Sequence, residues 1–314
     1  MGRGDVLDLG ERRAAAAVAR RYYLDGESKV DIATELGLSR FKVARLLDVA
    51  KETGIVRIEV VEPVEEQVLE LAAQVRSRWG LRECRVVPDS DSPREDVGRA
   101  AADLLGRLVG PQDVLGMPWS RSVHAMVDSL TSLPRVPVVQ LSGAMATNQV
   151  DSSTVAIVRR ASRIAGGGRH VFFAPLVMPD EEAAAAVRRD PAVREALAAA
   201  DTVTVAMVGV GAWAPGESTI YDAVDEAARE EVAAAGAVGE IAAVFFDEQG
   251  SLVETSVSRR VIALSGQQLV RIPTVLTSCH QLSRVPALVP ALRGGLVNAL
   301  VLTAEVAEEL LAVP

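Results

Sequence analysis

The sequence predicts an α/β protein with two domains, a small helical head at residues 1–60 and a larger α/β body at residues 61–314. At 314 residues, the chain exceeds the usual size of a single hydrophobic core. Near the N-terminus, two short amphipathic patterns meet at a glycine. Beyond the acidic segment around Pro63, short apolar runs alternate with helical patterns, which is typical of a mostly parallel sheet.

The composition is that of a globular protein, and the two predicted domains differ in charge. The net charge is −9, but residues 1–60 hold 11 basic and 10 acidic side chains, against 22 and 32 in residues 61–314. All three lysines, Lys29, Lys42 and Lys51, lie in the head. An acidic body would repel DNA, whereas the head could contact it. The chain has no signal-peptide pattern and no apolar run of the about 18 residues that a membrane span needs, so we expect a cytoplasmic protein.

The stretch at residues 28–47 fits a helix-turn-helix. Ser28 can cap a helix over Lys29–Leu36, and Gly37 can adopt the positive φ that ends it. Ser39 can then cap a second helix that runs to about residue 51. The aliphatic residues expected on the inward faces are Ile32, Leu36, Leu38, Val43, Leu46 and Leu47. This spacing is specific to the motif.

The exposed face of the second helix is basic. In the N-terminal half of a recognition helix, such side chains reach base edges and phosphates in the major groove. The residues expected to contact double-stranded operator DNA are Lys29, Ser39, Arg40, Phe41, Lys42 and Arg45. The alternative is a helical hairpin in an ordinary core with solvated basic residues. The motif spacing favours DNA binding.

Two flanking segments complete the predicted head. Residues Glu11–Leu24 form an amphipathic helix that would support the helix-turn-helix. Residues 55–63, IVRIEVVEP, alternate as a strand and would form a small wing. The next helical pattern, at residues 64–79, is either a linker or a contact between two copies of the chain.

The body is predicted to alternate strands and helices along its whole length. The strands expected are Arg85–Val87, Val114–Met117, Pro137–Leu141, His170–Phe173, Val203–Val208, Ala242–Phe246, Val261–Leu264, Thr274–Thr277 and Ala299–Leu302. The helices expected are Arg94–Val109, Ser120–Leu130, Ser153–Ala165, Glu181–Ala200, Val224–Ala235, Pro286–Leu292 and Ala304–Leu311. In such sheets, ligands bind beyond the carboxyl ends of the strands.

Small and polar residues follow several of these strands. Free N–H groups, hydroxyls and a guanidinium at a strand-to-helix turn suit an anionic or polyol group. The candidate effector-binding residues are Gly116, Trp119, Ser120, Arg121, Ser122, Ser142, Gly143, Asn148, Pro175, Gly209, Gly211 and Asp247. Any one loop could carry these residues for turn geometry alone. Together they favour a pocket for a small molecule.

The helix-turn-helix and these loops, in this order, resemble the SorC family of bacterial sugar-responsive transcriptional regulators. The stretch "IATELGLSRFKVARLLDVAKETGIVRIEV" is similar to the family's DNA-binding segment. The segments similar to its effector domain are "LGMPWSRSV", "VVQLSGA", "FFAP", "VGVG", "GAVGEIAAVFFDEQG" and "ALRGGLVNALVLTAEVAEELL". The resemblance covers about residues 14–312. It implies a winged-helix-like head and a Rossmann-like effector-binding domain related to sugar-phosphate isomerases. It also implies a homodimer or homotetramer whose grip on an operator responds to a phosphorylated sugar.

The chain departs from the family pattern in three loops. Trp119-Ser120 and Ser122 stand where the family has Trp-Gly and a Thr, and Thr303 replaces the usual acid after the last strand. Arg284, in "TSCHQLSR", stands where a lysine is expected. Because the body contains no lysine, a lysine Schiff base with the sugar is excluded. Arg284 could instead clamp a phosphate bidentately, so we expect a sugar phosphate or an atypical sugar-like metabolite, and no cofactor.

Two other functions remain open at this point. The body could be a sugar-phosphate isomerase or deaminase with Asp247 or Glu240 as general base, although no histidine or second acid visibly joins them. The protein could also bind DNA without responding to a ligand. Cys279 and His280 have no partner cluster in the sequence, so we expect them to line a pocket and predict no metal site.

Overall fold

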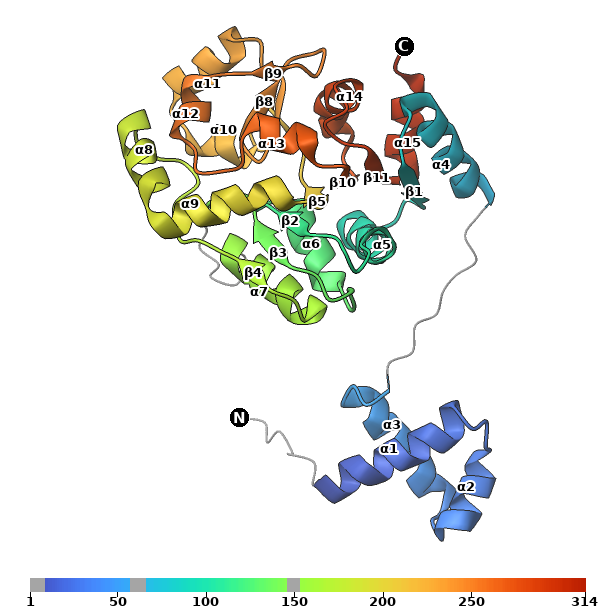
Figure 1. Cartoon of the computed structure of the whole chain (residues 1–314). Coiled ribbons are helices and arrows are strands. Elements are labelled where there is room, and N and C mark those ends of the chain that lie inside the picture. The colour runs from blue at the N-terminus through green and yellow to red at the C-terminus, as the bar shows by residue number, and fades with distance from the viewer. Residues whose placement is uncertain (1–8, 57–65, 146–152) are drawn as a thin grey trace. The chain divides into compact units, whose positions relative to one another are not determined.

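The computed structural model describes residues 9–56, 66–145 and 153–314, and the chain divides into two compact units, Met1–Pro63 and Val64–Pro314 (Figure 1). The boundary predicted after residue 60 and most of the predicted wing strand fall within residues 57–65, outside the described residues. In the part of the chain that is described, no helix is both long enough and apolar enough to cross a membrane.

The head is a bundle of three helices, α1 (Leu9–Tyr23), α2 (Lys29–Leu36) and α3 (Arg40–Glu52). Its core is small and aliphatic. The buried residues are Ala15, Val18, Ala19, Ile32, Ala33, Val43, Leu46, Leu47, Val49 and Ala50. Leu36 was expected to face inward, and this prediction is wrong: its side chain is 42% exposed, because it occupies the last turn of α2 beside the chain reversal.

The caps of the helix-turn-helix lie where the sequence predicts them. Ser28 Oγ accepts a hydrogen bond from the Asp31 N–H at 3.2 Å, and Ser39 Oγ accepts one from the Lys42 N–H at 3.1 Å. Gly37 ends α2 with φ of 63°, in the left-handed region that a Cβ disfavours. These three residues therefore fix the angle at which α3 leaves α2.

The body is built on a seven-stranded sheet in which every pair of neighbouring strands is parallel. In spatial order the strands are β1 (Glu83–Val87), β11 (Ala299–Thr303), β10 (Thr274–Cys279), β5 (Val205–Val208), β2 (Leu115–Met117), β3 (Val138–Gln140) and β4 (Arg169–His170). From β2 the chain proceeds to β3 and β4 at one edge, whereas from β5 it proceeds to β10 and β11 on the other side. The order reverses between β2 and β5, as in Rossmann-like folds.

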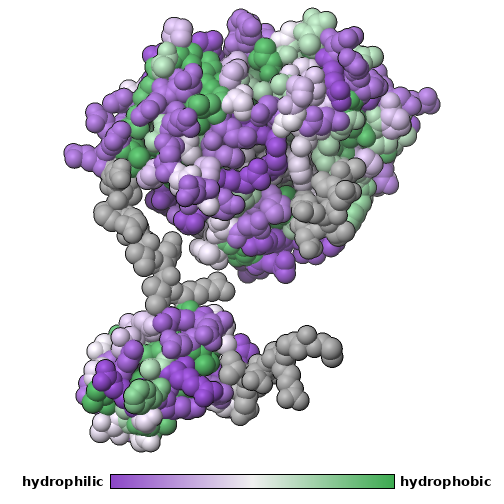
Figure 2. Space-filling model, turned by 180° about the vertical axis from the view of Figure 1, so that it is seen from behind, coloured by the Kyte–Doolittle hydropathy of each residue, from purple (hydrophilic) through white to green (hydrophobic). Residues whose placement is uncertain are grey.

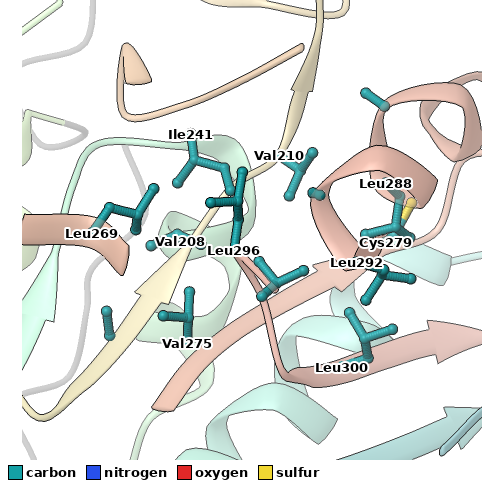
Figure 3. Packing of buried hydrophobic residues seen from close by; sticks show 14 of the residues in the cluster. Val208, Val210, Ile241, Leu269, Val275, Cys279, Leu288, Leu292, Leu296 and Leu300 are labelled. Atoms are coloured by element: carbon teal, nitrogen blue, oxygen red, sulfur yellow. The ribbon is translucent and has the colours of Figure 1, made fainter. Parts of the chain in front are cut away.

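Helices cover both faces of this sheet. One layer contains α5 (Pro93–Leu108), α6 (Arg121–Ser129) and α7 (Thr154–Ala165), and Val205 and Met207 of β5 point into it. The opposite layer contains α4 (Glu66–Trp79), α14 (Val285–Arg293) and α15 (Ala304–Ala312). Figure 3 shows the packing on this second face, where the side chains from the sheet and from α14 include Val208, Val275, Leu288, Leu292 and Leu300.

A second, antiparallel sheet stands beside the first and was not predicted. Its strands are β6 (Gly211–Ala212), β7 (Gly239–Ile241), β8 (Val244–Phe246) and β9 (Leu252–Val253). The helices that accompany it are α8 (Glu181–Arg189), α9 (Pro191–Ala198), α10 (Thr219–Ala223), α11 (Glu226–Ala234), α12 (Ser256–Arg260) and α13 (Gly266–Arg271). Hydrophilic residues cover most of the face of the body seen in Figure 2.

Four predicted elements of the body are wrong in detail. The strand expected at His170–Phe173 is displaced, because β4 is Arg169–His170 and residues 171–173 are not in a strand. The strand expected at Ala242–Phe246 begins two residues later, because Ala242 and Ala243 form the turn of the β7–β8 hairpin with φ of 52° and 69°. The expected strand Val261–Leu264 makes only isolated bridges. The expected helix Glu181–Ala200 is interrupted between α8 and α9, where Asp190 caps the second helix ahead of Pro191.

Two glycines of α5 give a matched test of this packing. A Cβ on Gly98 would lie 2.9 Å from the carbonyl oxygen of Ala125 in α6, whereas the nearest atom to a Cβ on Gly106 is 3.8 Å away. We expect Gly98→Ala to lower the free energy of unfolding by about 1–3 kcal/mol. Gly106→Ala should raise it by up to about 1 kcal/mol, because alanine is the better helix former. Urea unfolding of the two variants measures both, and equal shifts would contradict the close approach of α5 to α6.

Candidate functional site

The N-terminal half of α3 presents an exposed face of basic and aromatic side chains. Arg40, Lys42 and Arg45 are exposed there, and Phe41 is 88% exposed. This combination offers cations for phosphates and a ring for the apolar parts of base edges. Ser39 lies at the start of the same face, where its N–H and hydroxyl belong to the helix N-terminus.

An acid on α1, which the sequence analysis did not single out, faces the same side chains. Glu11 Oε1 lies 3.6 Å from Lys42 Nζ and 3.7 Å from Arg45 Nη2. Lys29 is half-buried, with its ammonium 5.5 Å from the centre of the Tyr22 ring. Exposed ion pairs of this kind are weak. A phosphate could therefore replace Glu11 as the partner of Lys42 and Arg45.

In the body, the loops after β2 and β5 meet at the point where the strand order reverses. A Cβ on Gly209 would lie 2.7 Å from the Cβ of Ser120, so only glycine allows this approach. Ser120 Oγ accepts a hydrogen bond from the Val123 N–H at 3.0 Å and begins α6. The two loops are thus fixed to each other beyond the carboxyl ends of the central strands, where α/β sheets bind ligands.

Two adjoining pockets open at this place, and Arg121 and Arg284 line both. We call the first the glutamate pocket; it has about 420 Å³ of space including its open mouth. Its lining is Trp119, Ser120, Arg121, Leu176, Gly209, Val210, Gly211, Glu217, Thr219, Ile220, Glu240, Ala242 and Arg284. The second, the arginine pocket, has about 270 Å³ on the same measure. Its lining is Arg94, Val97, Arg121, Ser122, Ala125, Ser278, His280, Gln281 and Arg284.

The arginine pocket concentrates positive charge. Burial, followed by the nearby charges of Arg284 and Arg94, lowers the pKa of Arg121 from its usual value. Burial and the same group of arginines also lower the pKa of His280, which keeps the imidazole neutral near pH 7. A bound anion would relieve this mutual repulsion. The donor set of guanidinium, hydroxyl and imidazole suits a phosphate or carboxylate.

The glutamate pocket offers a buried carboxylate. Glu240 is 7% exposed; its Oε1 accepts from Ser218 Oγ and its Oε2 from the Ala243 N–H, both at 3.0 Å. Burial raises the pKa of Glu240, opposed by these hydrogen bonds and by the charge of Arg284. A carboxylate held in this way can accept hydrogen bonds from hydroxyl or amino groups of a ligand.

One loop, residues 214–218, accepts hydrogen bonds from both of the arginines that line the two pockets. Arg284 Nε donates to Glu217 Oε2 at 3.2 Å, and its Nη1 donates to the Val210 carbonyl at 3.3 Å. Arg121 Nη2 donates to the Gly216 carbonyl at 2.8 Å. The guanidinium groups are therefore fixed in direction before any ligand arrives.

The structure brings together most, but not all, of the candidate effector-binding residues. Those that line the two pockets are Trp119, Ser120, Arg121, Ser122, Gly209, Gly211 and Arg284. Ser142 lies beneath them, where its Oγ accepts from the Trp119 N–H at 3.0 Å. Gly143 packs against the Pro175 backbone, close enough to exclude a side chain. These three residues support the pocket from outside its lining.

Three other candidates have different positions. Gly116 is buried in β2, where a Cβ would lie 2.8 Å from side-chain atoms of Leu141 and Val203. Asp247 closes the turn after β8 by accepting hydrogen bonds from the N–H groups of Gln249 and Ser251. Neither residue is part of the lining of the two pockets. Asn148 lies outside the described residues.

Sequence reasoning missed several polar lining residues. Arg94 is the second residue of α5, just after the β1–α5 loop, a strand-end position that the sequence pattern could have indicated. Glu217 lies in a loop that follows the unpredicted strand β6, so no pattern pointed to it. Glu240 was considered only as the general base of an enzyme. Cys279 and His280 were both expected to line a pocket. His280 does, whereas Cys279 is buried in the core and lines neither pocket.

Comparisons with known proteins agree with this arrangement. Residues 64–312 match the Sugar-bind family, described as "Putative sugar-binding domain". The transcriptional regulator LsrR of Klebsiella pneumoniae subsp. pneumoniae is 28% identical over 315 aligned residues, which cover 98% of this chain and 95% of LsrR. The uncharacterized transcriptional regulator YjhU of Escherichia coli K12 is 28% identical over 307 aligned residues, which cover 93% of this chain and 92% of YjhU.

A solved structure is similar over both the head and the body. The full-length sorbitol operon regulator SorC from Klebsiella pneumoniae superposes with a TM-score of 0.79 at 25% identity. The match covers 95% of this chain and 98% of SorC. The chain therefore belongs to the SorC family of sugar-responsive DNA-binding transcriptional regulators, and its residues 64–312 are the family's sugar-binding domain.

Proposed function

We propose that α3 places Ser39, Arg40, Phe41, Lys42 and Arg45 against operator DNA, and that the two pockets together bind one small effector. The effector carries an anionic group for the arginine pocket and hydroxyl or amino donors for the glutamate pocket. A phosphorylated sugar, or a sugar-like metabolite with another anionic group, has this chemistry. The observation that carries the proposal is that Arg121 and Arg284 line both pockets.

The energetics favour an anionic ligand. Hydrogen bonds to charged groups contribute about 1.5–3 kcal/mol each, and guanidinium groups offer them in pairs. Arg94, Arg121 and Arg284 face one small volume, so a dianion gains from all three and also removes their repulsion. The lysine-free body leaves arginine as the cation available for this task.

We also propose that the protein acts as a homodimer or homotetramer, so that two recognition helices contact a near-palindromic site about one DNA turn apart. Light scattering of the full chain measures its mass. In vitro selection from random duplexes identifies the site, and a site without two-fold symmetry would contradict the symmetric arrangement.

An enzymatic alternative rests on Glu240 as a general base. Both of its oxygens already accept hydrogen bonds, from Ser218 and Ala243, which favours a binding role. Turnover of a sugar phosphate by the full chain would support the enzyme instead. A protein that never responds to a ligand is the other alternative, and the effector screen described below tests it.

For the head, we expect Arg40→Ala with Arg45→Ala to weaken binding to the selected site by about 10-fold or more while the helices remain folded. The salt dependence should become shallower, by about 0.9 in the log–log slope for each phosphate that the variant no longer neutralises. Fluorescence anisotropy at several salt concentrations measures both. Arg163→Ala with Arg271→Ala, two exposed arginines of the body, is the matched control. Unchanged operator affinity in the head variant would contradict the placement of α3.

For the pocket, a library of phosphorylated and unphosphorylated sugars should contain a compound that raises the melting temperature of the full chain, since a ligand that binds only the folded state stabilises it. Arg284→Gln should weaken that compound by about 10- to 100-fold, because it loses charge-assisted hydrogen bonds. Arg271→Gln is the matched control on exposed α13. A hit that also changes operator binding identifies the effector; equal affinity in both variants would place it elsewhere.

For His280, we expect sulfate to bind more tightly as the pH falls from about 7 to about 5. In the empty pocket, burial and Arg94, Arg284 and Arg121 lower the pKa of His280, with Glu95 opposing them. A bound anion favours the imidazolium and raises that pKa, so binding takes up a proton. Sulfate keeps its charge over this range. Titration calorimetry of the wild type against His280→Gln isolates the effect, and the same pH dependence in both chains would exclude His280 as its source.

A further inference from the structure

We propose that Glu217 is an internal competitor for the effector's anionic group. Its carboxylate neutralises Arg284 in the empty pocket, and the anion must displace it to bind. This inference rests on the proposed effector site and adds the residue that sets its affinity for anions. It also identifies the loop at residues 214–218 as the element that moves when the anion binds.

The charges that line the pockets leave Glu217 as the available counter-charge. The two linings contain the arginines Arg94, Arg121 and Arg284, and their carboxylates are Glu217 and Glu240. Glu240 is committed to Ser218 and to the β7–β8 turn. Glu217 instead bonds Arg284 directly, at 3.2 Å, from the glutamate pocket, and Arg284 also lines the arginine pocket.

The pair is sheltered enough for the competition to be measurable. The side chain of Arg284 is 11% exposed and that of Glu217 is 21% exposed. At such burial, a guanidinium without a counter-charge costs free energy, so either Glu217 or the effector's anionic group must accompany Arg284. The effector's anion can take this position only when Glu217 leaves it. The free energy of breaking the Glu217–Arg284 pair is thus subtracted from the anion's affinity.

The loop that carries Glu217 is tied to the other charged groups of the site. The Gly216 carbonyl accepts from Arg121, and Ser218 Oγ donates to Glu240. Ser218 also caps α10, accepting from the Ile220 and Tyr221 N–H groups. An anion that draws Arg121 and Arg284 toward the arginine pocket pulls on two contacts of this loop at once. Displacement of Glu217 should therefore also move Ser218 and the start of α10, which Ser218 caps.

The test measures the binding of inorganic phosphate to the full chain by titration calorimetry. We expect Glu217→Gln to lower the Kd for phosphate by about five- to tenfold, equivalent to about 1–1.4 kcal/mol. Glu230→Gln, on the exposed face of α11, is the matched removal of one acid and should stay within about twofold, because exposed charges are screened. In the double variant Glu217→Gln/Arg284→Gln, the loss of the Glu217 carboxylate should no longer lower the Kd for phosphate, since the two residues act as a pair.

Each outcome decides the inference. A Kd that is unchanged or higher in Glu217→Gln overturns it, and so does an absence of phosphate binding in both wild type and variant. If wild type binds phosphate and Arg284→Gln abolishes that binding while Glu217→Gln has no effect, the proposed effector site is supported. The proposal that Glu217 competes with the anion is then wrong. Should Glu217→Gln fold poorly, Asp222→Ala tests the same loop, because it removes the carboxylate that accepts from the Gly216 N–H at 3.0 Å. Loosening the loop should also tighten phosphate binding, and weaker binding would overturn the inference.

Discussion

The close contact between the loops after β2 and β5 is the constraint on which the proposed effector site depends. These strands are neighbours at the point where the sheet order reverses, and the chain leaves them toward opposite edges of the sheet. In α/β sheets this is the place where a ligand-binding crevice forms. Gly209 and Ser120 hold the base of that crevice at a separation that no other residue at position 209 would permit. Ser120 also begins α6, which fixes the direction of Arg121. Trp119, Ser120, Arg121 and Gly209, which line the proposed site, belong to the two segments that this contact joins.

The site gathers more positive charge than it neutralises. Arg94 comes from α5, Arg121 from α6 and Arg284 from the turn before α14, and each depresses the protonation of His280. The fold tolerates this repulsion because carbonyl groups and Glu217 on neighbouring loops accept from the guanidinium groups. The pocket therefore carries charge complementary to an anion before the anion binds, and the proposed displacement of Glu217 is a reorganisation that lowers the anion's affinity.

The head and the body of this regulator each have their own hydrophobic core and differ in charge. The head is balanced in charge and presents Arg40, Lys42 and Arg45 on the exposed face of α3, whereas the body is acidic and keeps Arg284 of its pocket largely out of solvent. Glu11 and Glu217 stand in the same relation to their sites: each acid pairs with the cations that a phosphate would bind. Such internal partners lower affinity but prevent indiscriminate binding of anions.

The helix-turn-helix and the parallel sheet could be predicted from the order of the amino acids, because caps, a helix-ending glycine and apolar periodicity act within a few residues of one another. Ser28, Gly37 and Ser39 could be interpreted without a structure for this reason. The loops after β2 and β5 could be indicated as well, since the carboxyl ends of parallel strands share one edge. The folded chain was needed to show that Gly116 and Asp247 lie away from the lining and that Glu217 and Glu240 belong to it. Their positions depend on the antiparallel sheet and on contacts between residues far apart in the chain, and such contacts leave no periodic trace in the sequence.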